Sequence, residues 1–385
     1  MAYKDNPLGL YLHIPFCRQK CVYCDFYSLS GSEGRMDDYT AALCAHLQET
    51  APSAAEYLVD TVYLGGGTPS YLGPKRLTAI LDTVFQHYSV ADNAEITLEA
   101  NPDSAGDIHA LRTLRSAGFN RISLGMQSAD PSELKTIGRI HTPEQVRIAV
   151  NAARSAGFDN LSLDLIYGLP DQTPEGWAAN LSAAAELEPE HLSCYGLKVE
   201  EGTPLFARRS QFHLPDDEAQ ADLYLHTAEY LPQMGYRQYE ISNFSRPGRE
   251  SRHNLKYWTL APYLGFGPGA HSDFNGVRYS YEKDLDRYLQ GVVNHAPPLS
   301  EQIPISRQGR MEEWIMLGLR TVHGLDPQVF ETRFHRGFSP FLPFLTQCRQ
   351  AGYALFEDGR WHLTPSGFLL SNQIIGGLLE RLPQE

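Results

Sequence analysis

The sequence has no long apolar run. Among its 385 residues no stretch approaches the roughly 18 consecutive apolar residues that a membrane-spanning helix needs. The N-terminal segment Met1–Pro7 also lacks the apolar core of a secretory signal. We therefore expect a cytoplasmic protein with no integral membrane segment.

Positive charge is scarce as well. The chain carries 32 Lys and Arg against 46 Asp and Glu, which gives a formal net charge of −14. A broad phosphate-neutralising surface is difficult to build from such a chain, so we expect no nucleic-acid partner. The 42% hydrophobic content is that of an ordinary globular protein, and the length predicts two or three domains.

Cysteine is also rare, but its distribution is uneven. Three of the six cysteines, Cys17, Cys21 and Cys24, fall within eight positions, and the other three are scattered singly. A tight cluster in a reducing compartment indicates a metal or cluster site. Three thiolates can bind three irons of a 4Fe-4S cluster and leave the fourth iron open. The alternative is a zinc site completed by His13 or Cys44, although structural zinc sites usually pair two separated Cys-x-x-Cys halves.

Short apolar runs alternate with helical patterns through the first two-thirds of the chain. The expected strands are Leu8–Ile14, Leu58–Leu64, Ala94–Ala100, Arg121–Met126, Asn160–Tyr167 and His191–Leu197, with helices near 37–50, 74–88, 105–117, 143–156 and 174–187. An internal repeat supports this register, because residues 115–124 recur as 154–163, each copy with a glycine between helix and strand. The alternation predicts an α/β fold with a parallel sheet that curls toward a barrel.

The pattern changes after about residue 215. A long helix is expected at Asp216–Met234, followed by an aromatic-rich segment and a glycine loop at 265–269. Beyond Pro297 and Pro298 a separate unit follows, for which we expect helices at Glu312–Val322, Asp326–Phe334 and Pro340–Ala351, a hairpin at Tyr353–Leu363 and a final helix at Pro365–Leu382. We expect domains at 1–215, 216–298 and 299–385, the last of them smaller, helical and winged-helix-like, with a packing or lid role.

The cysteine loop and the segments after several strands resemble the radical S-adenosylmethionine (SAM) family. The similarity extends through Leu64–Pro69, Ile96–Pro102, Ser123–Ser128, Ser162–Pro170 and Leu264–Ser272 to the subgroup of oxygen-independent coproporphyrinogen III oxidases and their relatives. This resemblance implies a partial (β/α)6 barrel that carries a 4Fe-4S cluster on Cys17, Cys21 and Cys24 and binds SAM at the open iron. The SAM-binding positions that it implies are Tyr11, Tyr23, Gly66, Gly67, Thr68, Glu99, Gln127, Arg139 and Asp164.

Two of these assignments have evident physical reasons. Gly66 and Gly67 let the backbone approach the methionine amino group, so we expect Gly66→Val to weaken SAM binding more than folding. Arg139 can bind the SAM carboxylate in a bidentate manner. Glu99, Gln127 and Asp164 each end a strand, and we expect them at one rim of the barrel.

Two further features bear on the activity. Oxidases of this subgroup carry a further cysteine two residues after the third, where this chain has Phe26. Residues 253–258, His-Asn-Leu-Lys-Tyr-Trp, resemble the signature of a heme chaperone branch, which implies heme and heme-accepting client apoproteins as partners. The alternatives are coproporphyrinogen III oxidase activity and, less favoured by the charge, tRNA modification. Whether the protein is an enzyme stays open.

His253 is the tentative axial heme ligand, because a neutral imidazole coordinates heme iron. The alternative is a structural turn in which His253 and Asn254 bond the backbone and the neighbouring aromatics pack in the core. His271 is a weaker rival. Three arginines could meet heme propionates, although a solvated basic run is the simpler interpretation: Arg246, Arg249 and Arg252.

Overall fold

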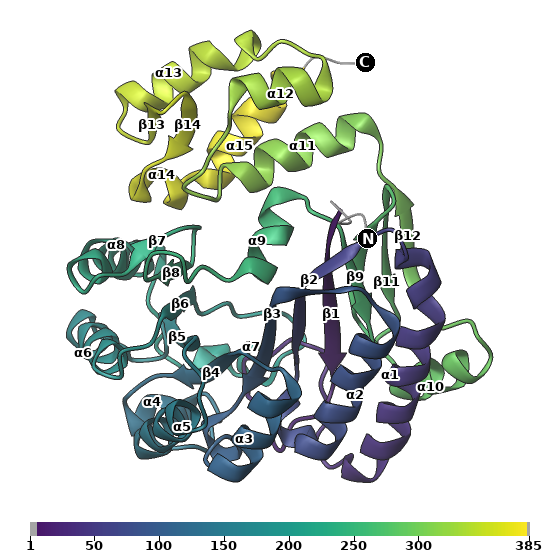
Figure 1. The fold of residues 1–385 in the computed structure, drawn as a ribbon. Coiled ribbons are helices and arrows are strands. Elements are labelled where there is room, and N and C mark those ends of the chain that lie inside the picture. The colour runs from purple at the N-terminus through teal and green to yellow at the C-terminus, as the bar shows by residue number, and fades with distance from the viewer. Residues whose placement is uncertain (1–5, 383–385) are drawn as a thin grey trace.

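The computed structural model describes residues 6–382 and contains one twelve-stranded sheet (Figure 1). Its order is β12-β11-β10-β9-β1-β2-β3-β4-β5-β6-β8-β7. The six central strands are those that the alternation predicted, with shifted ends: β1 Pro7–Ile14, β2 Leu58–Gly66, β3 Val90–Ala100, β4 Arg121–Gln127, β5 Leu161–Tyr167 and β6 His191–Gly196.

The central strands are parallel and largely buried. Leu12 of β1 pairs with Leu64 of β2, which pairs with Leu98 of β3, and all three side chains are fully buried. Strands covered on both faces read as continuous apolar runs, and that explains why the sequence located them. Because the strands are parallel, their carboxyl ends meet at one rim, and in Figure 1 the arrow of β1 points to that rim and away from the C-terminal lobe.

Six shorter strands extend this sheet, and the sequence did not predict them. Beside β1 lie β9 Tyr263–Phe266, β10 His271–Phe274, β11 Val277–Tyr281 and β12 Leu299–Pro304, and beyond β6 lie β8 Asn243–Ser245 and β7 Arg237–Gln238. Strand β9 runs parallel to β1, whereas β10 to β12 are antiparallel. Runs of two to six residues are too short to show a period, so their pairing depends on the sheet already formed.

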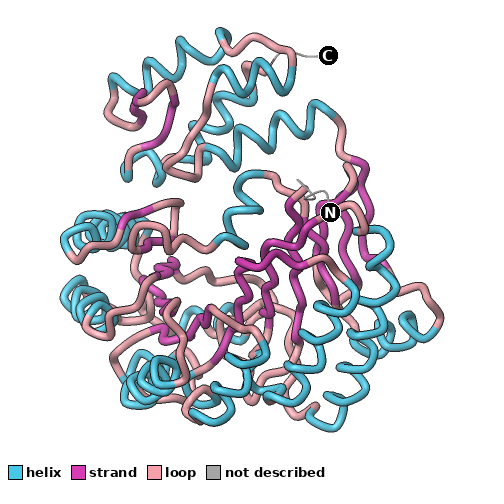
Figure 2. The backbone as a smooth tube through the Cα atoms, viewed as in Figure 1, coloured by secondary structure: helices cyan, strands magenta, loops and turns pink. Residues whose placement is uncertain are grey.

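Helices cover the outer face of the central strands (Figures 1 and 2). Two helices lie elsewhere: α7 Pro204–Ala207 packs against the cysteine loop, where Leu205 N donates to Val22 O at 2.8 Å, and α9 Arg252–Thr259 packs at the amino-terminal ends of the strands. The covering helices are α1 Met36–Thr50, α2 Pro74–His87, α3 Ile108–Ala117, α4 Pro131–Thr136, α5 Pro143–Ser155, α6 Pro174–Ala185, α8 Asp217–Gln233 and α10 Leu285–Val293. The main apolar core lies where their buried faces meet the sheet. Gly118 and Gly157 follow α3 and α5 with φ of +121° and +94°, as expected for glycines that end helices.

The C-terminal lobe has an apolar core of its own, joined by Tyr224 of α8. It comprises α11 Arg307–Gly318, α12 Pro327–Phe334, α13 Leu342–Gln350, the hairpin strands β13 Ala354–Glu357 and β14 Arg360–Leu363, α14 Pro365–Leu369 and α15 Ser371–Leu379. Helices followed by a hairpin are the predicted arrangement. Strand β12 lies beyond residue 298 but pairs with β11 in the large sheet.

Two predicted helices of this lobe need correction. The first begins at Arg307 rather than Glu312, because the Ser306 side chain caps its N-terminus. The final helix is not continuous: it breaks at Leu370, since Gly367 lies against the Tyr353 backbone while α15 turns to bury its own apolar residues in the lobe.

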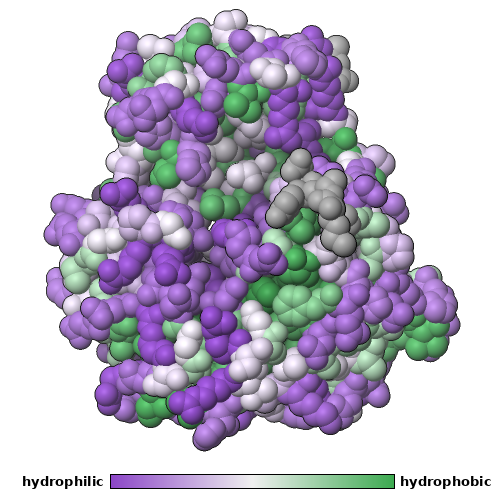
Figure 3. Space-filling view, in the orientation of Figure 1, coloured by the Kyte–Doolittle hydropathy of each residue, from purple (hydrophilic) through white to green (hydrophobic). Residues whose placement is uncertain are grey.

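The lobe is joined to the sheet by backbone and ionic contacts. Ile241 N donates to Arg320 O at 2.9 Å, and Arg310 of α11 pairs with Asp273 of β10 at 2.7 Å. Within residues 6–382 no helix is long and apolar enough to cross a membrane. Hydrophilic side chains predominate on the face seen in Figure 3.

Candidate functional site

The cysteine loop leaves β1 at the rim and is closed at its base. Cys17 N donates to Leu29 O at 2.9 Å, and Leu29 N donates to Pro15 O at 2.7 Å. Gly67 N and Thr68 N, which follow β2, donate to Ile14 O and Phe16 O at 2.9 and 2.8 Å. The loop is therefore fixed to the ends of the first two strands, where the sequence placed it.

Polar side chains donate to two of the three thiols. The Thr68 hydroxyl donates to Cys17 Sγ at 3.4 Å, and Arg139 Nη1 donates to Cys21 Sγ at 3.5 Å. Burial raises the pKa of Cys17 and raises that of Cys24 to about 11. Donors of this kind stabilise the thiolate, which is the form that binds iron. Among the described residues no three His, Cys, Asp or Glu side chains could hold one metal ion.

At the glycine run that ends β2, neighbouring atoms leave no space for a side chain. Gly66 has φ of +106°, and a Cβ there would collide with the His13 ring. A Cβ on Gly67 would lie 2.6 Å from Ile14 O. Gly66→Val would therefore strain the backbone and displace His13, so it carries a folding cost as well, and the expectation that SAM binding suffers more than folding stays a prediction.

Glu99, at the end of β3, is held beside this run. Its Oε1 accepts from Tyr63 Oη at 2.7 Å and its Oε2 accepts from Gly66 N at 2.9 Å. Burial raises the pKa of Glu99 to about 7, against the lowering effect of these two hydrogen bonds. A cation bound beside this carboxylate would favour its ionised form.

Arg139, Gln127 and Asn101 converge above Gly125. Arg139 Nη2 donates to Asn101 Oδ1 at 2.7 Å and to Gly125 O at 2.6 Å, while Arg139 Nε is buried without a hydrogen-bond partner. A Cβ on Gly125 would lie 2.8 Å from Gln127 Nε2 and 2.9 Å from Arg139 Nη2. Gln127 itself has φ of +63°, a conformation that a non-glycine residue keeps only when its surroundings enforce it.

The prediction that Asp164 ends its strand is wrong: Asp164 lies in the middle of β5, where it pairs with Ser193 of β6. Its carboxylate accepts from the Ser123 hydroxyl at 3.1 and 3.0 Å and from the Ser162 hydroxyl at 3.4 Å. Burial raises its pKa. Tyr11 Oη bonds His13 Nδ1 at 3.0 Å, and Tyr23 in the cysteine loop packs with Val22 against a small apolar cluster.

Sequence reasoning did not assign two residues of this site. Asn101 joins Arg139 to Thr68, since its Nδ2 donates to Thr68 Oγ1 at 3.1 Å. Tyr63 reaches Glu99 from the middle of β2. An Asn-Pro pair directly after a strand is a turn signal that could have directed attention to Asn101, whereas an alternating strand residue such as Tyr63 carries no such mark.

His253 is not at the rim. It is fully buried, and both ring nitrogens bond hydroxyl groups, Nδ1 with Thr61 Oγ1 at 2.9 Å and Nε2 with Tyr257 Oη at 2.7 Å. Burial lowers the pKa of His253 to about 3, so the ring is neutral. By contrast, the His271 side chain is exposed at the start of β10.

The three arginines near α9 already contact protein groups. Arg246 Nε donates to Pro189 O at 3.3 Å, Arg249 lies 3.8 Å from the Asp159 carboxylate, and Arg252 Nη1 donates to Asn93 O at 2.6 Å. Phe26, in the cysteine loop, is 62% exposed.

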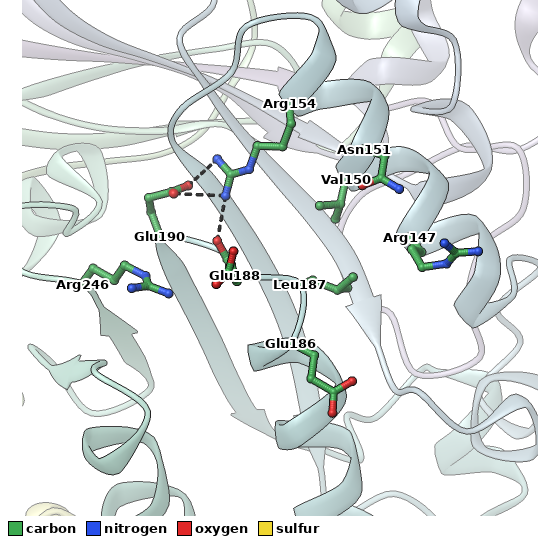
Figure 4. Close-up of a pocket in the computed structure, with 9 residues that line it drawn as sticks. All are labelled: Arg147, Val150, Asn151, Arg154, Glu186, Leu187, Glu188, Glu190 and Arg246. Carbon is green, nitrogen blue, oxygen red and sulfur yellow. Dashed lines mark hydrogen bonds and ion pairs between the residues drawn. The ribbon is translucent and has the colours of Figure 1, made fainter.

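A hollow of about 660 Å³ lies away from the cysteine loop, between α5 and the turn before β6 (Figure 4). Its basic lining is already paired: Arg154 bonds Glu190 at 2.8 and 3.0 Å, and Arg147 bonds Glu144. We assign no function to it.

The rim therefore fits the cofactors that the resemblance implied. Three cysteines share one loop, a glycine run lies beside that loop, and a buried guanidinium that contacts Cys21 and Asn101 keeps an unpaired Nε. An unpaired buried donor is a group that a carboxylate ligand could satisfy.

Comparison with known proteins gives the class. Residues 11–182 match the radical SAM superfamily, and residues 305–370 match the HemN C-terminal domain. The fold is similar to that of coproporphyrinogen III oxidase (HemN) from Escherichia coli, with a TM-score of 0.86, 27% identity and coverage of 99% of this chain and 92% of that one. The chain is thus a radical SAM protein with a HemN-type C-terminal domain.

Full-length relatives define the family more closely. Heme chaperone HemW of Escherichia coli (strain K12) is 44% identical over 381 residues, which cover 97% of this chain and 98% of the relative. Heme chaperone HemW of Bacillus subtilis (strain 168) is 33% identical over 376 residues, which cover 97% and 99%. The chain belongs to the heme chaperone HemW family.

Proposed function

We propose that this protein is a heme chaperone that binds heme and passes it to client apoproteins. The observation that carries the proposal is the similarity to proteins named heme chaperone HemW, which reaches 44% identity and covers 97% of the chain. Heme is the cargo in this proposal, and the rim site holds the resident cofactors.

Cys17, Cys21 and Cys24 would each bind one iron of a 4Fe-4S cluster, whose fourth iron would be open to SAM. Bound there, the cluster would supply the electron that cleaves SAM. Arg139 would meet the SAM carboxylate through its unpaired Nε, and Glu99 would accept from the methionine amino group. The remaining proposed contacts are Tyr11, Tyr23, Gly66, Gly67, Thr68, Gln127 and Asp164, to which the geometry adds Asn101.

The second candidate is coproporphyrinogen III oxidase activity, which the TM-score of 0.86 to HemN favours. Phe26 weighs against it, because it occupies the position of the oxidases' additional cysteine and presents an exposed phenyl ring there. The test is anaerobic incubation of the cluster-loaded protein with coproporphyrinogen III, SAM and a reductant. We expect no protoporphyrinogen IX, and its formation in repeated turnovers would establish the oxidase.

His253 as axial heme ligand stays a prediction, and it requires the buried ring to give up a hydrogen bond that it now makes. The ring would have to give up Thr61 or Tyr257 before a nitrogen could reach iron. We expect His253→Ala to change the absorption spectrum of bound heme, since an axial imidazole sets the ligand field. A spectrum changed only by His271→Ala would assign the exposed His271 instead.

A further inference from the structure

Helix α9 is anchored to the amino-terminal halves of β1, β2 and β3, at the opposite end of the barrel from the cysteine loop. His253 N donates to Glu95 Oε1 of β3 at 3.0 Å, and Lys256 Nζ pairs with Asp60 of β2 at 2.6 Å. A Cβ on Gly9 of β1 would lie 2.7 Å from Lys256 Cδ and 3.3 Å from His253 Cε1. The Lys256 and His253 side chains lie this close to β1 because position 9 has no side chain.

The His253 ring reaches from this helix into the barrel. It stacks on the Tyr63 ring with centroids 5.1 Å apart and planes 24° apart, and it lies 6.4 Å from the Tyr11 ring. The hydrogen bonds to Thr61 and Tyr257 fix its orientation from both sides. His253 therefore determines where the Tyr63 ring can lie.

Tyr63 connects His253 to the rim of the barrel. Its hydroxyl donates to Glu99 Oε1 at 2.7 Å, and the other Glu99 oxygen accepts from Gly66 N at 2.9 Å. A Cβ on Gly65 would lie 2.7 Å from Tyr63 Cε1 and 2.9 Å from Glu99 Cδ, so these side chains are packed over a glycine. One stacking contact and two hydrogen bonds thus connect α9 to the glycine run.

We propose that His253 is a positioning residue for the SAM site, which acts on Glu99 through Tyr63. This inference rests on the proposed function, because it assumes that the rim binds SAM. It gives the His-Asn-x-x-Tyr-Trp segment a role besides heme binding. It also means that His253 cannot leave to bind heme iron without releasing Tyr63, so heme ligation by His253 and SAM binding oppose each other.

The test is SAM affinity, measured by calorimetry on the cluster-loaded protein without reductant, so that SAM stays intact. Tyr63→Phe is expected to weaken SAM binding by about tenfold, the effect of losing its hydrogen bond to the Glu99 carboxylate. His253→Ala is expected to weaken it by up to the same factor, because it removes the ring on which Tyr63 stacks. The double variant should bind SAM no more weakly than the weaker single variant, because both act on one chain of contacts.

The matched control is His46→Ala. His46 is also buried with both ring nitrogens bonded to hydroxyls, of Tyr288 and Tyr281, but it belongs to α1 and its ring lies against Phe266 and these two tyrosines, not against Tyr63. We expect it to lose thermal stability and keep wild-type SAM affinity. Tyr63→Phe keeps the ring in place, so the inference is testable even if His253→Ala does not fold.

Unchanged SAM affinity in Tyr63→Phe and His253→Ala would overturn the inference alone. Additive losses in the double variant would also overturn it, because the two residues would then act independently. Absence of SAM binding by the wild-type protein would overturn the proposed cofactor together with the inference. Added heme should weaken SAM binding in the wild type and not in Tyr63→Phe, and an equal effect on both would overturn the opposition between the two ligands.

Discussion

Glu240 offers a quantitative test of the packing between the barrel and the C-terminal lobe. It lies between β7 and β8, its backbone pairs with Thr321 of the lobe, and its side chain is fully buried. Its carboxylate accepts from Ser242 N at 3.2 Å and from the Asn243 side chain. Burial outweighs these bonds and raises the pKa of Glu240 from 4.5 to about 7.

The direction in which pH changes the folding stability depends on whether the folded or the unfolded state holds the proton. Between pH 4.5 and 7 the folded protein keeps a proton on Glu240 that the unfolded chain has lost, so the stabilising contribution present below pH 4.5 disappears as pH rises through 7. At about 1.4 kcal/mol per pH unit this amounts to about 3 kcal/mol. For a chain of 385 residues that corresponds to about 4 °C in Tm.

The assay is calorimetry of the cluster-loaded protein at one scan rate between pH 5 and 8. Glu240→Gln removes the titration, so the Tm of the variant minus that of the wild type should rise by about 3 °C from pH 5 to pH 8. Glu99, whose pKa is also about 7, remains in both proteins and cancels in the difference. Glu380→Gln, the same change at an exposed position, should show no such gain. A Tm difference between Glu240→Gln and wild type that does not vary with pH would refute the reasoning.

Three further outcomes are expected at the rim. Cys21→Ser should lose the cluster, read as iron and sulfide content after anaerobic reconstitution; stoichiometric zinc without sulfide in the wild type would contradict the cluster assignment. Arg139→Lys should weaken SAM binding tenfold or more, because lysine cannot reproduce the guanidinium contacts, while the exposed Arg112→Lys should leave it unchanged. Gly125→Ala should weaken SAM binding by displacing Gln127 and Arg139, whereas Gly376→Ala, in open space, should not.

The sequence predicted the strands and helices in which apolar residues recur with a regular period. The six central strands and the helices between them follow the alternation of apolar runs, and the glycines of the repeat end α3 and α5 as expected. The six flanking strands were missed because their residues pair only against an existing sheet edge. The break at Leu370 was missed because it depends on the contact of Gly367 with Tyr353.

The site was predictable where strand ends carry polar residues. Glu99 and Gln127 end their strands near the cysteine loop, since parallel strands bring their carboxyl ends together. The pairing of Tyr63 with Glu99 and the enclosure of His253 depend on side-chain packing across three strands. No sequence pattern predicts such packing between side chains of different strands.

The central claim is tested most directly by heme transfer. The purified, heme-loaded protein is mixed with an apoprotein that gains a distinct absorption spectrum on heme uptake, with an apoprotein trap for free heme as the control. The account predicts that heme moves to the acceptor faster than free dissociation into the trap allows, and that no protoporphyrinogen IX forms from coproporphyrinogen III under reducing conditions with SAM. Transfer no faster than dissociation, together with turnover of coproporphyrinogen III, would contradict it.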